Sequence, residues 1–330
     1  MKAIVYTEYG QPDDVLELRE VEKPTPKDDE VLVKVHAASV NYSEWAFVRG
    51  KPFLVRLMWS GLLKPKYKIP GADVAGRVEA VGDNVKQFQP GDEVFGELGL
   101  FGLGAFAEYV SVPENALVLK PANISFEEAA AVPYTAITAL RGLCNNGQIQ
   151  PGQKVLINGA SGGIGTFAVQ IAKSFGAEVT GVCSTRKLDM VRSIGADHVI
   201  DYTGEDFTRS GKCYDLILAA GGYHSISDYK RALSPKGIYV MIGGSTAQKL
   251  QAMLLGPLIS MTGSKKMGVL MGKPNQKDLV FLIELFEAGK VVPVIDRCYP
   301  LSEVAEAFRY LGEGHAKGKV VITVEHNNKI

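Results

Sequence analysis

The sequence of 330 residues predicts an α/β protein of two domains, a doubly wound parallel sheet and an antiparallel barrel or sandwich. Two observations lead to this prediction. Residues 154–187 read as a strand, a glycine-rich turn, a helix and a second strand. Short alternating apolar runs before residue 122 also give way to alternating helices and strands after Ser125. The length is sufficient for two domains that each bury a core.

The first 122 residues contain apolar or alternating runs separated by proline and glycine turns, which favours short antiparallel strands. These runs are 2–7, 16–21, 31–40, 74–81, 93–95 and 105–112. A long connection at 41–70 interrupts them and carries several aromatic residues, among them Trp45, Trp59 and Tyr67. Aromatic side chains in such a connection either cap a core or line a substrate pocket, and the sequence leaves both open.

From Ser125 onward the pattern changes to helices and strands. Ser125 and Glu128 form a capping box that begins a helix, which Pro133 interrupts before it resumes through Leu143. Later segments indicate a helix at 190–194 and strands at 198–201, 215–220 and 238–242. Since short helices separate these strands, they are expected to cross over in a parallel sheet.

The end of the chain predicts helices at 278–288 and 302–311 and an alternating strand at 319–324. A lone strand needs a sheet to join, so we expect this tail to fold back onto the first domain. The predicted domains are therefore 1–122 together with 270–330, and 123–269.

The turn at 159–165, with the sequence G-A-S-G-G-I-G, lies between an apolar strand and an amphipathic helix. A helix start leaves backbone N–H groups unpaired and positive, and glycine lets a phosphate approach them without a Cβ clash. We therefore predict that this turn binds the pyrophosphate of a dinucleotide.

The same residues also match the G-x-S-x-G nucleophile elbow, which likewise stands between a strand and a helix. A serine hydrolase that uses Ser161 is thus an alternative. It would need an acid, for which Asp215 and Asp228 are available, and a histidine, for which His315 is available.

The charges balance, with 36 acidic and 36 basic residues and no basic block. This balance argues against nucleic acid as a main partner and against electrostatic docking to a membrane, so a small-molecule partner is expected. The apolar segment 252–262 is too short to span a bilayer, and the N-terminus does not have the shape of a signal peptide.

The four cysteines lie far apart and form no C-x-x-C pair. Their spacing predicts neither a disulfide framework nor a zinc knuckle. We expect reduced thiols and a soluble protein of a reducing compartment, the cytoplasm.

Three motifs resemble those of the medium-chain dehydrogenase/reductase superfamily. They are P-G-A-D-V-A-G-R-V at 70–78, G-D-N-V-K-Q-F-Q-P-G-D at 82–92, and P-G-Q-K-V-L-I-N-G-A-S-G-G-I-G at 151–165 with Gln170 and Lys173 behind it. The similarity covers nearly the whole chain and is strongest to the zinc-free quinone oxidoreductases. It implies a GroES-like β-barrel catalytic domain, a Rossmann dinucleotide-binding domain and a homodimer.

The resemblance also bears on metal and on chemistry. Zinc-dependent relatives have G-H-E where this chain has Gly71-Ala72-Asp73, and they have a cysteine near Asn41, so no metal site is expected. Without a Lewis acid, alcohol oxidation is disfavoured. Hydride transfer from a reduced nicotinamide to a quinone, or to the β-carbon of an α,β-unsaturated carbonyl (an enone), needs only hydrogen-bond donors.

The family's active-site sequence V-N-P-x-D-W corresponds to 40–45, V-N-Y-S-E-W, in this chain. By this resemblance Asn41 donates a hydrogen bond to the acceptor oxygen, and Tyr42 and Tyr67 are candidate donors or proton sources. The bland alternatives are that Asn41 caps a turn and that both tyrosines are pocket walls.

The cofactor is predicted to be NADPH. The second strand of the nucleotide fold ends at Cys183-Ser184 without the acid that holds the ribose diol of NAD, and Arg186 and Lys187 follow. The resemblance implies that Ser184, Lys187 and Tyr202 hold the 2′-phosphate. It assigns the remaining cofactor contacts to Thr138, Ser161, Gly162, Gly163, Ile164, Ala220, Gly221, Gly243, His315, Ala316 and Lys317.

These observations favour an NADPH-dependent quinone or enone reductase. A second hypothesis, from another class, is an NADPH-binding sensor or structural protein with little turnover.

Overall fold

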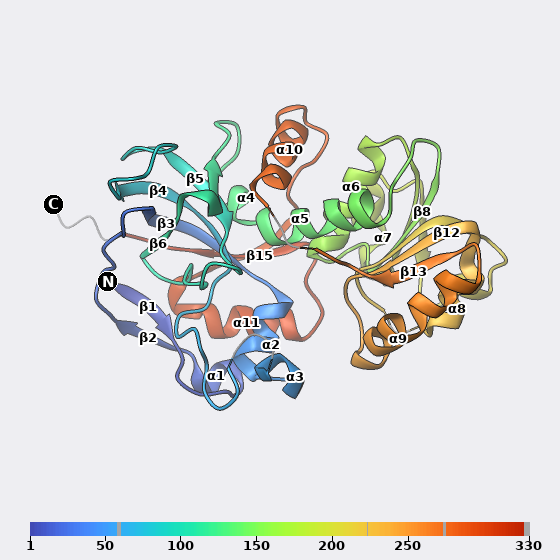
Figure 1. Cartoon of the computed structure of the whole chain (residues 1–330), viewed down its shortest axis with the longest axis horizontal. Coiled ribbons are helices and arrows are strands. Elements are labelled where there is room, and N and C mark those ends of the chain that lie inside the picture. The colour runs from blue at the N-terminus through green and yellow to red at the C-terminus, as the bar shows by residue number, and fades with distance from the viewer. Residues whose placement is uncertain (58–60, 223, 273–274, 327–330) are drawn as a thin grey trace. The chain divides into compact units, whose positions relative to one another are not determined.

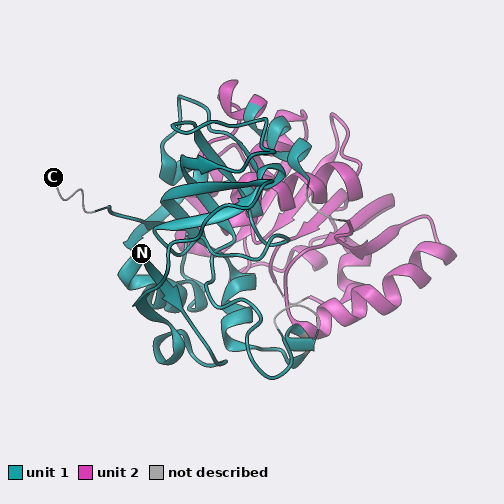
Figure 2. Ribbon diagram, turned by 60° about the vertical axis from the view of Figure 1, so that its left-hand side comes forward, with its two compact units in different colours: residues 1–134, 275–283, 295–330 teal, residues 135–274, 284–294 magenta. Residues whose placement is uncertain are grey.

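The computed structural model describes residues 1–57, 61–222, 224–272 and 275–326. The chain forms two compact units (Figure 2). Unit 1 comprises residues 1–134, 275–283 and 295–330, and unit 2 comprises residues 135–274 and 284–294. The parallel-sheet domain and the separate, mostly antiparallel sheet domain confirm the predicted fold class.

Unit 1 contains a seven-stranded sheet in the order β14-β15-β3-β4-β5-β7, with β6 also paired to β3. Its strands are β3 (Glu30–Val40), β4 (Asp73–Val81), β5 (Glu93–Glu97), β6 (Tyr109–Pro113), β7 (Leu117–Leu119), β14 (Ile295–Pro300) and β15 (Lys319–Thr323). All pairs are antiparallel except β14 with β15. Val31, Val33 and Val35 of β3 are fully buried, as alternation over a core requires.

The remaining elements of unit 1 surround this sheet (Figure 1). They are the antiparallel pair β1 (Lys2–Val5) and β2 (Glu17–Glu20), and the helices α1 (Pro12–Val15), α2 (Tyr42–Arg49), α3 (Phe53–Val55), α4 (Phe126–Ala130), α11 (Val304–Gly312) and the first part of α10 (Gln276–Glu287). The described part of the 41–70 connection thus contains two helices. The tail folds back as predicted, with Val320 of β15 opposite Val40 of β3.

Unit 2 is built on six parallel strands in the order β10-β9-β8-β11-β12-β13. Their bounds are β8 (Lys154–Asn158), β9 (Glu178–Cys183), β10 (His198–Asp201), β11 (Tyr214–Ala219), β12 (Leu233–Met241) and β13 (Lys266–Val269). The chain winds outward in both directions from β8 and β11, so the point where the strand order reverses lies between them.

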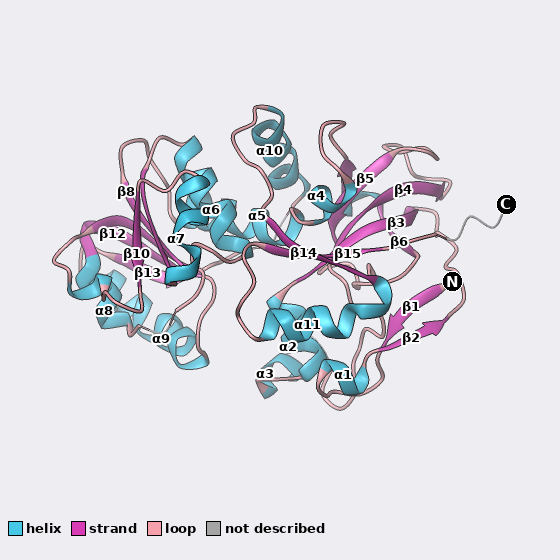
Figure 3. Cartoon of the chain, turned by 180° about the vertical axis from the view of Figure 1, so that it is seen from behind, coloured by secondary structure: helices cyan, strands magenta, loops and turns pink. Residues whose placement is uncertain are grey.

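The helices of unit 2 cover both faces of this sheet, α6 and α7 on one and α8 and α9 on the other (Figure 3). They are α5 (Pro133–Arg141), α6 (Gly163–Ser174), α7 (Leu188–Ser193), α8 (Ile226–Ala232) and α9 (Thr246–Thr262), with a π-helical turn at Gly142–Asn146. Among the described residues, no helix is both long enough and apolar enough to cross a bilayer.

The units divide the chain elsewhere than at our predicted boundaries of 122 and 270. Phe126 stacks on His36 of β3 with 4.4 Å between ring centroids, which ties α4 to unit 1. In unit 2, Phe286 packs edge-on against Phe167, and Gln170 exchanges two hydrogen bonds with the backbone of Val292. Side-chain packing thus groups α4 with unit 1 and residues 284–294 with unit 2, and the predicted domain boundaries stay a prediction.

Three strands were missed by the sequence prediction, and the shortest of them is β7, with three residues. β13 has only four residues and contains Gly268, and β14 has two charged residues in a run of six. Neither segment shows the apolar–polar alternation of a half-buried strand. Each is held in its sheet by pairing with the neighbouring strand.

Candidate active site

The glycines of the turn between β8 and α6 differ in how much space a side chain would have. A Cβ on Gly165 would lie 2.1 Å from the carbonyl oxygen of Gly159, and a Cβ on Gly159, whose φ is +88°, would lie 2.9 Å from the nitrogen of Gly221. These two glycines are required by packing. At Gly162 the nearest such atom is 3.7 Å away, and its φ of −85° suits any residue. The bare backbone at Gly162 therefore leaves room at the start of α6 that the protein itself does not fill.

The start of α6 has the charge of an anion site. Gly162 is the N-cap, no acidic side chain lies in the first turn, and the helix continues for 12 residues. Its first backbone N–H groups carry the positive end of the helix dipole. A pyrophosphate fits this position in both space and charge.

The other residues predicted to bind the cofactor's nucleotide lie at the same edge of the sheet. The backbone nitrogens of Ala220 and Gly221 both donate to the carbonyl oxygen of Asn158, at 2.9 and 3.0 Å. Gly243 donates to Ala219, and a Cβ on it would lie 2.3 Å from the carbonyl oxygen of Ala220. The glycine turn, Ala220, Gly221 and Gly243 thus meet at the carboxyl ends of β8, β11 and β12.

The next two strands bring the predicted phosphate residues to this edge. Ser184 and the 3-10 turn Thr185–Lys187 directly follow β9, and the Tyr202 nitrogen donates to the Cys183 carbonyl oxygen at 3.2 Å. Arg186 is exposed and Lys187 is half-buried. The structure therefore brings Ser184, Lys187 and Tyr202 together at the ends of two adjacent strands.

The carboxylate of Asp201, which directly precedes Tyr202, is already engaged in hydrogen bonds. Asp201 ends β10, and its carboxylate accepts from Thr185 Oγ1 at 2.5 Å, from Thr203 Oγ1 at 2.7 Å and from Thr203 N at 3.0 Å. These hydrogen bonds, that from Thr185 first, lower the pKa of Asp201. The Asp201 oxygens accept hydrogen bonds from Thr185 and Thr203. Asp201 ends β10, so it is not the carboxylate that would bind a ribose at the end of β9.

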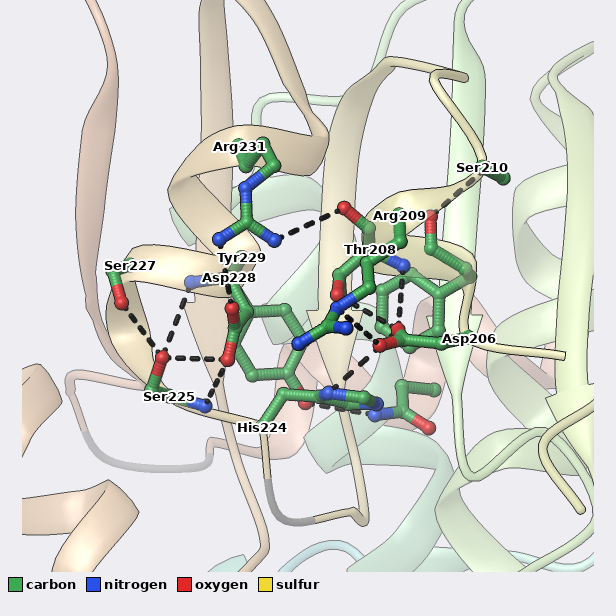
Figure 4. A network of polar contacts seen from close by, with 12 residues as sticks. Asp206, Thr208, Arg209, Ser210, His224, Ser225, Ser227, Asp228, Tyr229 and Arg231 are labelled. Atoms are coloured by element: carbon green, nitrogen blue, oxygen red, sulfur yellow. Dashed lines mark hydrogen bonds and ion pairs between the residues drawn. The ribbon is translucent and has the colours of Figure 1, made fainter.

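Tyr229, which lies beside His224 in Figure 4, belongs to a polar network that orients Asn158. Tyr229 Oη accepts from Asn158 Nδ2 at 2.7 Å and from Gln248 Nε2 at 3.1 Å, and burial raises the pKa of Tyr229 to about 12. The His224 ring lies edge-on to both Phe207 and Tyr229. Since Asn158 directly precedes the glycine turn and its carbonyl oxygen accepts from the chain after β11, this network fixes the turn.

The hydrolase arrangement is not assembled around Ser161. Asp215 accepts from the backbone nitrogen of Lys154 at 2.9 Å, which places it at the amino ends of the strands, opposite the turn. Asp228 accepts from Ser225 Oγ at 2.6 Å in the capping box of α8 (Figure 4). Both acids that the hydrolase alternative needs are therefore engaged by other groups.

Four further predicted cofactor residues lie in α5 or in unit 1. Thr138 is half-buried within α5. His315, Ala316 and Lys317 lie in unit 1, between α11 and β15, where His315 pairs with Glu313 at 3.5 Å and the Lys317 nitrogen donates to Asp296. Their roles toward a cofactor remain predictions.

Unit 1 contains a buried cluster of charged and polar side chains around Asn41. Lys319 Nζ, only 2% of whose residue surface is exposed, donates to Asn41 Oδ1 at 2.5 Å and forms an ion pair with Asp73 at 3.3 Å. Asn41 Nδ2 donates to Glu44 Oε2 at 2.9 Å and to Asp73 Oδ2 at 3.0 Å. The side-chain amide of Asn41 therefore joins one ammonium group and two carboxyl groups.

These contacts change what Asn41 is able to do. It is the N-cap of α2, as the bland alternative predicted, and its backbone nitrogen donates to Glu44 at 3.1 Å. Both of its amide hydrogens go to carboxyl oxygens, so the amide has none left for an acceptor oxygen in this arrangement. In this arrangement Asn41 positions its neighbours, and the role of direct donor that we predicted for it stays a prediction.

Three carboxyl groups share the cluster with one ammonium group. Burial, then the neighbouring Asp73, raises the pKa of Glu44 to about 8 and that of Glu97 to about 7. Burial lowers the pKa of Lys319, and the charges of Asp73 and Glu44 oppose that change. Burial and the excess of carboxyl groups over cations therefore favour the protonated form of Glu44 at neutral pH and leave Glu97 near the midpoint of its titration.

The two predicted tyrosines lie nearby in the chain but outside this cluster. Tyr42 is 62% exposed at the first position of α2, with its ring 4.9 Å from that of Trp45. Tyr67 is half-buried, beside Gly102 and with Lys66 over its ring. Both remain candidates for contact with an acceptor.

The sequence prediction missed Lys319, Asp73 and Glu97 as members of the site. They come from β15, β4 and β5, which are far apart in the chain, and only the fold brings them to Asn41. One signal was present, since a lysine stood at the start of an otherwise apolar strand. Within the described ranges, no three histidine, cysteine, aspartate or glutamate side chains are arranged to hold a metal ion.

We expect Glu97→Gln to remove part of the pH dependence of stability. The folded chain keeps Glu97 protonated up to about pH 7, whereas the ordinary pKa is 4.5. Between these values the folded state binds the extra proton, so the free energy of unfolding falls as pH rises, by about 3 kcal/mol in all. Urea unfolding at pH 5 and pH 8 measures this loss, which the variant should lack. The surface variant Glu79→Gln is the control, and equal losses in all three proteins would refute the assignment.

Comparison with known proteins agrees with this arrangement. The model of the alcohol dehydrogenase GroES-like domain matches residues 27–122, and that of the zinc-binding dehydrogenase matches residues 194–322. The chloroplast envelope quinone oxidoreductase homolog of Arabidopsis thaliana is 36% identical over 98% of both chains. The chain belongs to the quinone oxidoreductase branch of the medium-chain dehydrogenase/reductase superfamily.

Further relatives show the range of this branch. The 2-methylene-furan-3-one reductase of Solanum lycopersicum is 38% identical over 98% of this chain and 79% of that protein. The solved quinone oxidoreductase from Coxiella burnetii is 29% identical, with a TM-score of 0.85 over 98% of this chain and 99% of that one. This quinone oxidoreductase fold places the glycine turn in the Rossmann unit and Asn41 in the GroES-like unit.

Proposed function

We propose that the chain is an NADPH-dependent reductase that transfers hydride to a quinone or to the β-carbon of an enone. The observation that carries this proposal is the open backbone at Gly162, at the start of a helix with no acid in its first turn. Relatives are named as a quinone oxidoreductase homolog and an NADPH-dependent alkenal/one oxidoreductase, each 36% identical to this chain.

The residues present fit the cofactor at the carboxyl edge of the parallel sheet. The backbone from Ser161 to Ile164 would hold the pyrophosphate, and Ser184, Arg186, Lys187 and Tyr202 would hold a 2′-phosphate. Ala220, Gly221 and Gly243 present backbone without bulky side chains to the same edge, and Thr138 and His315–Lys317 are further proposed contacts. When bound, the reduced nicotinamide supplies the hydride.

The chain's own residues would bind the cofactor, orient the acceptor and stabilise the charge that develops on it. Negative charge develops on the acceptor oxygen, and the hydroxyl groups of Tyr42 and Tyr67 are the proposed donors to it. Asn41 is held rigidly by Lys319, Glu44 and Asp73, and so positions the start of α2, where Tyr42 stands. We propose that the reaction needs no zinc, because a quinone or an enone is already electron-poor and needs only hydrogen-bond donors at its oxygen.

Arg186→Ala is expected to weaken NADPH binding about tenfold, because a charge-assisted hydrogen bond to the 2′-phosphate is lost. NADH, which lacks that phosphate, should bind unchanged. Titration of both cofactors by fluorescence or calorimetry measures the two affinities. Arg192→Ala is a matched control, since Arg192 is also exposed but pairs with Asp189 at 2.8 Å. An equal loss for both cofactors would contradict a phosphate contact.

The reaction itself is tested by following the 340 nm absorbance of NADPH with a panel of quinones and enones. Oxidation that depends on the acceptor supports a reductase. Tight binding of NADPH without oxidation by any acceptor would favour the alternative, a sensor or structural protein. A cytoplasmic location and a homodimer are also proposed. Four cysteines without a disulfide suit a reducing compartment, and sedimentation equilibrium tests the dimer.

A further inference from the structure

Helix α9 packs against unit 2 with its smaller and more polar side. Gln248, Ala252 and Gly256, four residues apart, are its buried positions. A Cβ on Gly256 would lie 2.6 Å from the carbonyl oxygen of Met267, and Ser260 Oγ accepts from Met267 N at 2.9 Å. The helix therefore lies close against β13 through small side chains. Ordinary surface helices bury large apolar residues instead.

The opposite side of α9 is apolar and exposed. Its large side chains recur at helical spacing and have these exposed fractions: Leu250 49%, Met253 58%, Leu254 67%, Leu255 43%, Leu258 58% and Met261 83%. We call these six residues the outer face of α9. Single exposed leucines need no explanation, but a contiguous set along one helix marks a surface that something covers.

The chain around this face is strongly cationic, although the whole chain is neutral. Residues 229–272 contain no acidic residue and six basic ones, Lys230, Arg231, Lys236, Lys249, Lys265 and Lys266, of which Arg231 is paired with Asp228 at 3.1 Å. Lys249 is exposed in the first turn of α9, and Lys266 is exposed just beyond its last turn. Lys265 Nζ donates to the carbonyl oxygen of Lys230 at 2.7 Å, which gathers further positive charge at that end.

We propose that the outer face of α9 docks on a lipid bilayer that carries anionic headgroups. A helix of 17 residues lies in the plane of the interface, with the leucine and methionine side chains among the acyl chains. Lys249 and Lys266 then meet the anionic headgroups at the two ends of the helix. From the balanced charge of the whole chain we predicted no electrostatic docking to a membrane. That balance hides this basic segment, because acidic residues elsewhere in the chain offset it.

The charge favours a bilayer over a second copy of the chain. A symmetric contact through this face would bring Lys249 and Lys266 of both copies together, and 229–272 offers no carboxylate to offset them. An anionic lipid surface instead complements both features of the face at once.

Flotation of the full chain with vesicles tests the proposal, using phosphatidylcholine alone and an equal mixture with phosphatidylglycerol. We expect binding to the anionic vesicles, weakened at high salt. Met253→Gln/Leu254→Gln/Leu258→Gln should abolish it, and glutamine keeps helix propensity high. Lys249→Gln/Lys266→Gln should lower the vesicle partition constant about 25-fold, since each lysine contributes about fivefold near such a surface.

Two matched controls keep the result specific. Leu18→Gln/Leu119→Gln removes two exposed leucines from unit 1, and Lys64→Gln/Lys86→Gln removes two exposed lysines there. Both should bind vesicles like the original chain. Circular dichroism checks that every variant is folded, and the lysine variant tests the proposal even if the apolar one does not fold.

Three results would overturn the proposal. They are no binding to anionic vesicles, binding that the α9 variants do not change, and a fall in oligomeric mass in the apolar variant without vesicle binding by the original chain. The last would identify a second copy as the cover. None of these results depends on NADPH oxidation, so the proposed reductase activity is judged separately.

Discussion

Lys319→Met is expected to lower the free energy of unfolding by about 3–5 kcal/mol, because it leaves buried carboxyl groups without their cation. Asp73 is fully buried and would keep only neutral partners, among them Ser39 Oγ at 2.7 Å and the Tyr134 nitrogen at 2.8 Å. Asn41 Oδ1 would also lose its donor. Urea unfolding at pH 7 measures the loss.

A double variant separates lost charge pairing from lost packing. Asp73→Asn/Lys319→Met removes both members of the ion pair, so it should be more stable than Lys319→Met alone. Lys212→Met, at an exposed position of unit 2, is the control and should change stability by less than about 0.5 kcal/mol. If Lys319→Met were as stable as the original chain, the cluster would not depend on its cation.

Gly162→Asp is expected to weaken NADPH binding about 100-fold without destabilising the fold. Aspartate is a favourable N-cap and the conformation at Gly162 suits it, since the nearest atom beyond its chain neighbours and the helix's own backbone, the Gly159 carbonyl oxygen, would lie 3.7 Å from its Cβ. Its carboxylate would nevertheless stand where the pyrophosphate is proposed to bind, at the positive end of α6. Calorimetric titration gives the affinity, and thermal unfolding gives the stability.

Gly162→Asn is the matched variant, because asparagine has the same shape and cap preference without the charge. It should lose much less affinity than Gly162→Asp. Gly165→Ala should behave differently, since its methyl group would lie 2.1 Å from the Gly159 carbonyl oxygen and must destabilise the unit. Unchanged NADPH binding by Gly162→Asp would place the cofactor elsewhere.

The nucleotide fold could be predicted from sequence because its signals are local. The glycine turn stands beside its own strand and helix, and 198–201 was predicted as a strand with the bounds that β10 has. The residues after β8, β9, β11 and β12 meet because parallel strands bring their carboxyl ends to one edge. Topology alone therefore assembles that part of the site.

The cluster in unit 1 could not be predicted in the same way. Asn41 was recognised from its neighbours in the chain, but Asp73 lies 32 residues away from it and Lys319 lies 278 residues away. Only the pairing of β15 with β3, and of β3 with β4, brings them together. The outer face of α9 was missed for a related reason, since an apolar segment does not reveal which of its sides is buried.

The central claim, that the chain moves hydride from NADPH to an electron-poor acceptor, is tested most directly by isotope transfer. An enone is incubated with NADPH deuterated at the transferable position of the nicotinamide, and the product is analysed by mass spectrometry and NMR. The account predicts one deuterium on the β-carbon for each NADPH oxidised. NADPH oxidation with no deuterium in the product, or no oxidation with any acceptor, would contradict it.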